Sequence, residues 1–269
     1  MDWLQSIIYG FALSLSEFMP VSSLAHQKIL CELFGVDRPD VVQNLLVHAA
    51  ALAALLFGCN NMLDQIKRSV RVSRRGSRHA DSILDYRLVR TAAIPMLVIY
   101  LILTYVFGRN YSFPLMALFL LINGVIIFIS GRMLQGNKDA RSMSKLDSYL
   151  IGAVSAISAL PGISRVGAGT SVAISRRADR LHALNWAFLL SIPALALICG
   201  LDVIGLFSAA NLSVVSGNLL CYFFSAFSSF IGGYTGVMLM RLLAVKVGYT
   251  GFAYYSWGAA LFTFVLYLL

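Results

Sequence analysis

Charge and cysteine are both scarce in this 269-residue chain, and each shortage excludes a class of protein. Only 12% of the residues are charged and 59% are hydrophobic, whereas a soluble globular domain carries about 25% charged residues. The four cysteines are scattered without CxxC spacing, which disfavours a metal or redox site. The start, MDWLQ, lacks a basic n-region, so we expect the first apolar run to stay in the mature protein. The composition favours an all-α polytopic membrane protein.

Six apolar stretches are long enough to cross a bilayer core, which takes about 20 residues. The expected spans are residues 41–57, 91–107, 115–130, 183–201, 212–240 and 249–269. The stretch 212–240 is overlong, and a break at Gly232 and Gly233 would shorten it.

Two further apolar runs stop early, each at a proline. The run 3–19 ends at Pro20, and the run 149–160 ends at Pro161. Proline breaks a helix, and non-helical backbone at membrane depth is tolerated only where protein or a water-filled cavity covers it. We therefore predict two re-entrant hairpins with broken-helix tips, at residues 1–34 and 149–175.

Basic residues fix the expected orientation. Of the 21 Lys and Arg residues, 17 lie in four segments, at 67–90, 132–145, 176–180 and 241–246. With six spans and two re-entrant hairpins, all four segments fall on one side of the membrane, which the positive-inside rule makes cytoplasmic. The net charge of +9 is then the basic face of a membrane protein, and we expect no nucleic-acid partner.

The predicted elements repeat. Residues 1–131 contain one re-entrant hairpin and three spans, with a basic cytoplasmic loop at 60–90, and residues 149–269 also contain one hairpin and three spans. Because three is an odd number, the two halves would have opposite orientations. Inverted-topology repeats with discontinuous helices place a binding site near the midplane, where the two broken tips would meet.

The two tips carry the chemistry of an anion site. Arginine matches phosphate oxygens with a planar fork, glycines let a ligand approach a helix N-terminus, and serine hydroxyls add donors. A histidine could move a proton near neutral pH, and a serine beside it could be a nucleophile. The candidates are Glu17, Ser22, Ser23 and His26 in the first tip, and Gly162, Ser164, Arg165, Gly167 and Thr170 in the second. The alternative is a purely structural ion pair between Glu17 and Arg165.

These tips resemble the signatures of a known family. SEFMPVSSLAH, residues 16–26, resembles the first signature, EGxTEFLPVSSxGH, of the undecaprenyl-pyrophosphate phosphatase (bacitracin-resistance) family, and ALPGISRVGAG resembles its second, PGxSRSGxT. The resemblance implies an enzyme of the bacterial inner (plasma) membrane that removes the terminal phosphate of undecaprenyl (polyprenyl) diphosphate. The product is the monophosphate lipid carrier for cell-wall and surface-glycan synthesis. The site would open to the periplasmic or outer face.

The resemblance also implies roles. Glu17, Ser23, His26 and Arg165 would be catalytic, with Glu17 as a ligand of a divalent cation, Mg or Ca. Phosphate would be bound by Ser22, Ser23, Gly162, Ser164, Arg165, Gly167 and Thr170. Whether serine or a bound water attacks stays open, and a homodimer is possible.

Among the departures from the family pattern, Leu13 replaces the first glutamate, Ala25 a glycine, Val166 a serine and Gly169 a threonine. Two alternatives therefore stay open. One is a polyprenyl-phosphate transporter or binding protein without efficient hydrolysis, and the other is a phosphatase for another isoprenoid or lipid phosphate. Outside the tips, we interpret His48 as a packed or hydrogen-bonded helix residue.

Overall fold

The computed structural model describes residues 1–74, 86–107, 111–134, 136–138, 142–207, 219–246 and 248–268, and these contain helices but no β-strand. Within them, six helices are long and apolar enough to cross a membrane. They are α3 (Val41–Gly58), α5 (Tyr86–Phe107), α6 (Phe113–Arg132), α9 (Arg180–Leu206), α10 (Leu219–Lys246) and α11 (Gly251–Leu268). The predicted all-α polytopic membrane protein is confirmed.

Helix α10 corrects one expectation, because it runs unbroken through Gly232 and Gly233. Both glycines lie against α1 (Trp3–Phe18). A Cβ at Gly232 would lie 2.4 Å from the carbonyl oxygen of Phe11, and one at Gly233 would lie 2.6 Å from Ser14 Oγ. These glycines therefore allow two helices to pack closely. The start of the predicted span, residues 212–218, lies outside the described residues.

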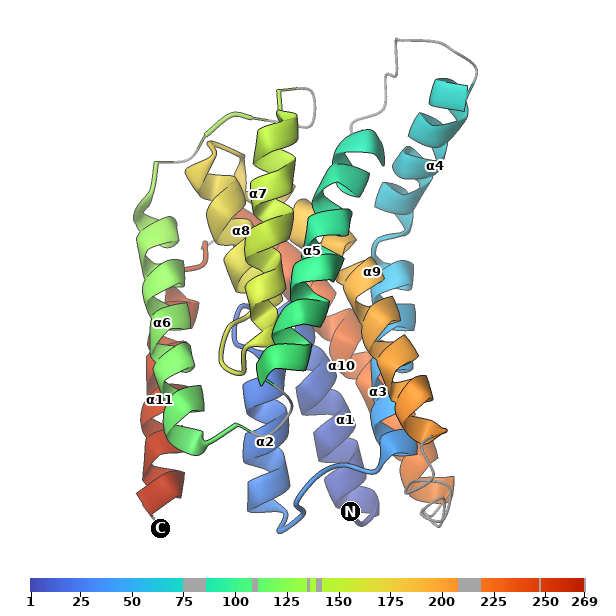
Figure 1. The fold of residues 1–269 in the computed structure, drawn as a ribbon, viewed down its shortest axis with the longest axis vertical. Coiled ribbons are helices and arrows are strands. Elements are labelled where there is room, and N and C mark those ends of the chain that lie inside the picture. The colour runs from blue at the N-terminus through green and yellow to red at the C-terminus, as the bar shows by residue number, and fades with distance from the viewer. Residues whose placement is uncertain are drawn as a thin grey trace.

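The predicted basic loop at 60–90 also needs correction, because it contains a helix, α4 (Asn60–Arg74). This helix continues upward from the end of α3 and stands at the edge of the bundle (Figure 1). The remaining part of that loop up to residue 85 lies outside the described residues.

Two short helical pairs approach one another from opposite ends of the bundle (Figure 1). Helices α1 and α2 (Ser23–Leu33) come from the end that carries the N-terminus. Helix α7 (Lys145–Ser155), a 3₁₀ turn (Ala156–Ala159) and α8 (Arg165–Ser175) come from the other end. Each pair reverses direction near the middle of the bundle, around the two prolines that the sequence pattern singles out.

Local sequence explains where these helices begin. Asp2 and Gln5 form a capping box at the start of α1, and Ser144 and Asp147 form one at the start of α7. Beyond Phe18 the backbone becomes extended, as expected for a residue that precedes a proline. Both pairs are thus anchored at their outer ends and interrupted at their inner ends.

Asp147 connects the outer ends of the two helices of the second pair. Its carboxylate is fully buried and accepts hydrogen bonds from Arg176 Nε, just after α8, at 2.5 Å and from Lys138 Nζ at 3.1 Å. Burial alone would raise the pKa of Asp147, but hydrogen bonds from Ser144, Arg176 and Lys138 hold that pKa well below its usual value. The carboxylate therefore stays ionised and joins the two helices of the pair.

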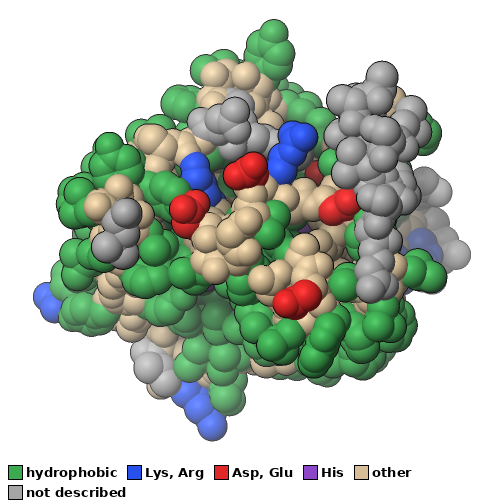
Figure 2. All heavy atoms as spheres, turned by 90° about the horizontal axis from the view of Figure 1, so that it is seen from below, with side chains coloured by type: hydrophobic (Ala, Val, Ile, Leu, Met, Phe, Trp, Pro, Cys, Tyr) green, Lys and Arg blue, Asp and Glu red, His purple; other side chains and the backbone are tan. Residues whose placement is uncertain are grey.

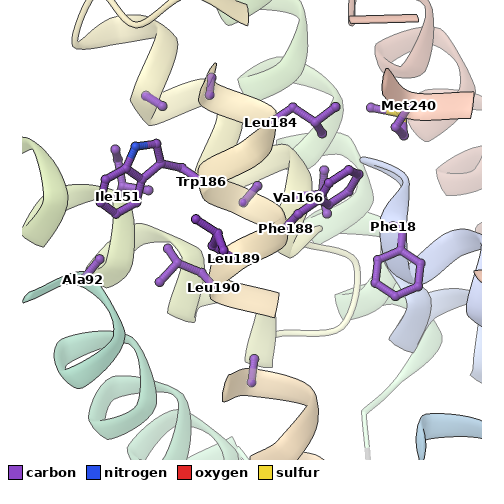
Figure 3. Packing of buried hydrophobic residues seen from close by; sticks show 14 of the residues in the cluster. Phe18, Ala92, Ile151, Val166, Leu184, Trp186, Phe188, Leu189, Leu190 and Met240 are labelled. Atoms are coloured by element: carbon purple, nitrogen blue, oxygen red, sulfur yellow. The ribbon is translucent and has the colours of Figure 1, made fainter. Parts of the chain in front are cut away.

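Helix α9 forms the centre of the apolar core, because it packs against α3, α5 and α8. Its side chains Leu184, Phe188 and Leu190 are fully buried. Figure 3 shows Phe188 beside Val166 of α8, with Phe18 of α1 nearby. The Phe18 and Phe188 rings meet edge to face with centroids 6.2 Å apart. The core therefore holds both helical pairs against one central helix.

We expect Gly232→Ala to lower the melting temperature of the detergent-solubilised protein by several degrees, because the added methyl group collides with the α1 backbone. Gly258→Ala is the matched control, since nothing lies within 4 Å of a Cβ there and alanine favours a helix by about 1 kcal/mol. Thermal unfolding of the two variants measures the difference. Equal melting temperatures would show that α1 and α10 do not pack this closely.

Candidate functional site

The two turns are joined directly by hydrogen bonds. The N–H of Gly162 donates to Ser22 Oγ at 3.0 Å, and Ser164 Oγ donates to the carbonyl oxygen of Met19 at 2.9 Å. Gly162 has φ +112°, and a Cβ there would lie 2.7 Å from the backbone nitrogen of Leu120. Only glycine fits this position, so the second turn can reach the first.

Asn123 of α6 ties both turns to the surrounding bundle, and sequence reasoning missed it. Its Nδ2 group donates to the carbonyl oxygen of Pro20 at 3.1 Å and to Ser256 Oγ at 3.0 Å. Its Oδ1 accepts from the N–H of Ser164 at 2.9 Å. The available signal was a lone amide in an apolar span, where a polar group needs partners.

Glu17 and Arg165 meet where the turns meet. Arg165 donates from one terminal nitrogen to Glu17 Oε1 at 2.6 Å, and both side chains are buried. Ser23 Oγ donates to the other carboxylate oxygen, Oε2. Nε of Arg165 is buried and has no hydrogen-bond partner within the described part of the chain. Both oxygens of the carboxylate therefore have hydrogen-bond partners, whereas the guanidinium still has an N–H group without one.

A cavity of about 360 Å³ lies beside this ion pair, a size within the usual range for small-molecule sites. Glu17, Ser23, Ser164 and Arg165 line it from the two turns. Other helices and connections contribute polar and charged side chains, which include Gln27, Lys28, Asp37, Arg38, Asn44, His48, Tyr100 and Asp202.

The cavity extends from the turns toward the end of the molecule that carries the N-terminus, since its lining includes the connection between α2 and α3 and the last turn of α9, which lie at that end (Figure 1). Figure 2 views this end and shows acidic and basic side chains gathered around its centre, with apolar side chains around them. Charged groups therefore line the approach, and Glu17 and Arg165 lie at the inner end.

The other predicted site residues do not line the cavity in this structure. His26 bonds through Nδ1 to the carbonyl oxygen of Ser22 at 2.8 Å and through Nε2 to the Tyr255 hydroxyl at 2.6 Å. Thr170 Oγ1 donates to backbone oxygens of its own helix, at Val166 and Gly167. Ser22 and Gly162 bond to each other instead.

Packing accounts for the departures from the family pattern. Leu13 packs with Tyr9, Cys31 and Val47 and is almost fully buried. Val166 faces the apolar core beside Phe188 (Figure 3). A Cβ at Gly169 would lie 2.7 Å from Ser155 Oγ, so a threonine there would require the Ser155 side chain to shift. Ala25 is fully buried in a third apolar cluster.

A second polar cluster lines the cavity from α3 and α9. His48 Nδ1 lies 2.8 Å from Asp202 Oδ2, and Asn44 Nδ2 lies 3.1 and 3.2 Å from the two Asp202 oxygens. His48 is hydrogen-bonded, as interpreted from the sequence, but it also faces the cavity. Because Asp202 is 154 residues away along the chain, no local pattern could have paired the two.

The described residues do not form a ready cation site. They contain no group of three or more His, Cys, Asp or Glu side chains that could hold a metal ion. Both oxygens of Glu17 are engaged, one by Arg165 and the other by Ser23. Divalent cations such as Mg and Ca need several free oxygen ligands, so the turn residues as arranged do not fit a resident cation.

Comparisons with known proteins cover both turns. A family model described as bacitracin resistance protein BacA matches residues 6–262. An undecaprenyl-diphosphatase from Desulfosudis oleivorans is 27% identical over 260 residues, which cover 92% of this chain and 92% of the relative. Proteins with the same name from Carboxydothermus hydrogenoformans and Prochlorococcus marinus are 28% and 29% identical, covering 96% and 91% of this chain and 94% and 88% of their own.

We expect Asn123→Ala to destabilise the protein, because the carbonyl of Pro20 and the N–H of Ser164 would lose their partner. An unsatisfied buried polar group costs about 1–3 kcal/mol. Asn60→Ala, an exposed asparagine at the start of α4, is the matched control and should unfold like the parent. Thermal unfolding checks this difference, and an unchanged melting temperature for Asn123→Ala would contradict the bridging role.

Proposed function

This chain belongs to the BacA family of bacitracin resistance proteins, and we propose that it is an integral membrane phosphatase that removes the terminal phosphate of undecaprenyl diphosphate. The released monophosphate is the lipid carrier that cell-wall and surface-glycan synthesis reuses. One observation carries this proposal. Arg165 from one turn meets Glu17 and Ser23 from the other at the inner end of a charged cavity.

Phosphate binding is supported by three kinds of donor. The Arg165 guanidinium keeps N–H capacity beyond its bond to Glu17, and arginine binds phosphate oxygens bidentately. Ser22 caps α2 without a side-chain hydrogen bond, so the first N–H groups of that helix can point to an anion. Lys28, which lines the cavity, adds a cation at its wall.

The bond from Ser23 to Glu17 supports a role for both residues in attack on phosphorus. A carboxylate that accepts the hydroxyl proton of serine can serve as its base. His26 lies outside the cavity, held by Ser22 and Tyr255. We assign it to the orientation of the first turn, with Ser22, Gly162, Ser164, Gly167 and Thr170 shaping the turns.

We also propose how the protein lies in its membrane. The pairs α1–α2 and α7–α8 would be re-entrant hairpins of two inverted repeats, residues 1–131 and 149–269. The ends of α6, α8 and α10, which carry basic residues, lie at one end of the bundle, and the cavity extends to the other end (Figure 1). In a bacterial inner membrane the basic end would face the cytoplasm, which leaves the cavity open to the periplasm.

A transport or binding role is the second candidate, and one observation favours it. Glu17 is fully engaged by Arg165 and Ser23, and the neighbouring family position is the packed Leu13. An anion clamp without a free carboxylate would suit a polyprenyl-phosphate carrier as well as an enzyme.

We expect the purified protein to release phosphate from a C55 diphosphate in detergent. Arg165→Ala should lower the rate by more than 100-fold, since it removes a fixed cation beside the phosphates and leaves Glu17 without its partner. Arg132→Ala is the matched control. This arginine is exposed and lies over the Phe128 ring, away from the cavity, so its rate should match the parent.

Leu13→Glu separates the two candidates. We expect no gain in rate, because the new carboxylate would be placed among Tyr9, Cys31 and Val47. A parent protein without phosphate release, together with release gained by Leu13→Glu, would overturn the proposed activity and favour transport.

We expect this protein to have a low affinity for a divalent cation, because Glu17 is the one turn carboxylate and is already engaged. We propose that Mg or Ca arrives with the substrate, bound by its phosphate oxygens and water. Chelator should lower phosphate release, and millimolar but not micromolar cation should restore it. Full activity at micromolar cation would contradict this expectation.

A further inference from the structure

We propose that His48, held by Asp202, is the proton-transfer residue of this cavity and takes the proton of the attacking water. The inference rests on the proposed phosphatase function and deepens it. It assigns a role to two residues of the spanning helices α3 and α9 that lie outside both turns.

The geometry fixes the histidine ring. Nδ1 of His48 lies 2.8 Å from Asp202 Oδ2. A carboxylate accepts a proton and does not donate one when ionised, so this contact places the ring proton on Nδ1. Nε2 then keeps a lone pair, and it has no hydrogen-bond partner among the residues that the structure describes. The His48 side chain is 11% exposed and lines the cavity.

The carboxylate is held as firmly as the ring. Asp202 is 1% exposed, and Asn44 Nδ2 lies within hydrogen-bond distance of both its oxygens. Asn44 is oriented in turn by its Oδ1, which accepts from the Tyr9 hydroxyl at 3.1 Å and from Gln27 Nε2 at 2.7 Å. Four helices, α1, α2, α3 and α9, thus contribute to the orientation of one imidazole.

His182, a second buried histidine, is an example of a histidine that is packed within one helix and does not face the cavity. His182 of α9 accepts a hydrogen bond from Trp186 Nε1 at 2.9 Å, one turn along the same helix. It does not line the cavity. The pairing of His48 with a carboxylate from another helix, and its exposure to the cavity, distinguish it from this arrangement.

The attacking water needs a base whose acceptor atom is not already engaged. Glu17 is engaged on both oxygens, and His26 is bonded outside the cavity. The cationic side chains that line it, Lys28, Arg38 and Arg165, carry protons already. Imidazole is the side chain whose proton affinity suits transfer near neutral pH, and a carboxylate behind it stabilises the imidazolium that forms.

Hydrolysis by water exchanges one phosphorus–oxygen bond for another. The water oxygen forms a bond to the terminal phosphorus, and the bond from that phosphorus to the bridging oxygen breaks. The electron pair of the broken bond stays on the bridging oxygen, which leaves as part of the lipid monophosphate. The water proton passes to Nε2 of His48, and solvent later removes it. If Ser23 attacks first, its oxygen forms the bond to phosphorus, its proton passes to Glu17, and the bond to the bridging oxygen breaks. Water then attacks the phosphoserine and gives its proton to His48, while the bond from phosphorus to Ser23 breaks and Ser23 regains its proton from Glu17.

Charge in the cavity supports this assignment. Three carboxylates, those of Glu17, Asp37 and Asp202, line the cavity together with three basic side chains. Arg165 lies against Glu17, and the His48 ring and the Asn44 amide lie against Asp202. A carboxylate beside the ring stabilises the imidazolium that forms when His48 takes the water proton.

The test compares His48→Gln with the matched control His182→Gln, using the full-length protein in detergent and a short-chain polyprenyl diphosphate. We expect His48→Gln to lower kcat by 100-fold or more and to change KM by less than threefold, while His182→Gln keeps the parental kcat. Asp202→Asn should lower kcat less, by about tenfold, because the imidazole remains. Thermal unfolding confirms that each variant is folded.

His48→Ala distinguishes a role in proton transfer from a purely structural role, because added imidazole can replace a base but not a packing contact. Free imidazole in the buffer should restore part of the phosphate release, because the removed ring borders an open cavity. Loss of kcat without rescue, or loss that follows a fall in substrate binding, would overturn the inference. A parental kcat in His48→Gln would overturn it while leaving the phosphatase function intact. An inactive parent protein would overturn both.

Discussion

The buried ion pair between Glu17 and Arg165 is the contact on which the rest of the structure depends. Each charge alone would be costly in this interior, and removing one partner of such a pair typically costs about 3–5 kcal/mol. The two residues lie 148 positions apart, so both turns must be held at one place. Asn123, the bond from Gly162 to Ser22 and the close packing at Gly232 all serve that requirement.

Much of the site follows from where polar residues and prolines coincide. Pro20 and Pro161 interrupt apolar runs beside Glu17 and Arg165, and such groups in a membrane interior need partners. That reasoning brought together Glu17, Ser23, Ser164 and Arg165, which line one cavity. It did not separate residues that face the cavity from those that hold the turns, because a pattern within eleven residues does not show which way each side chain points.

The failures have physical reasons. Paired glycines lower helix propensity and also permit close helix packing, and at Gly232 and Gly233 the tertiary contact with α1 decided the outcome. Asn123 and Asp202 are single polar residues in apolar spans, and their importance comes from partners far along the chain. Local periodicity carries no information about such long-range pairs.

The departures from the family pattern acquire a different meaning once the packing is known. Leu13 and Val166 are apolar residues in apolar clusters, and Gly169 lies close to the Ser155 side chain of α7. None of the three lines the cavity. Some of the polar groups that do line it lie on α3 and α9, where His48 and Asp202 face the same space as Arg165. The chemistry of this cavity therefore depends on all the groups that line it. A signature motif of one turn does not include the groups that other helices contribute.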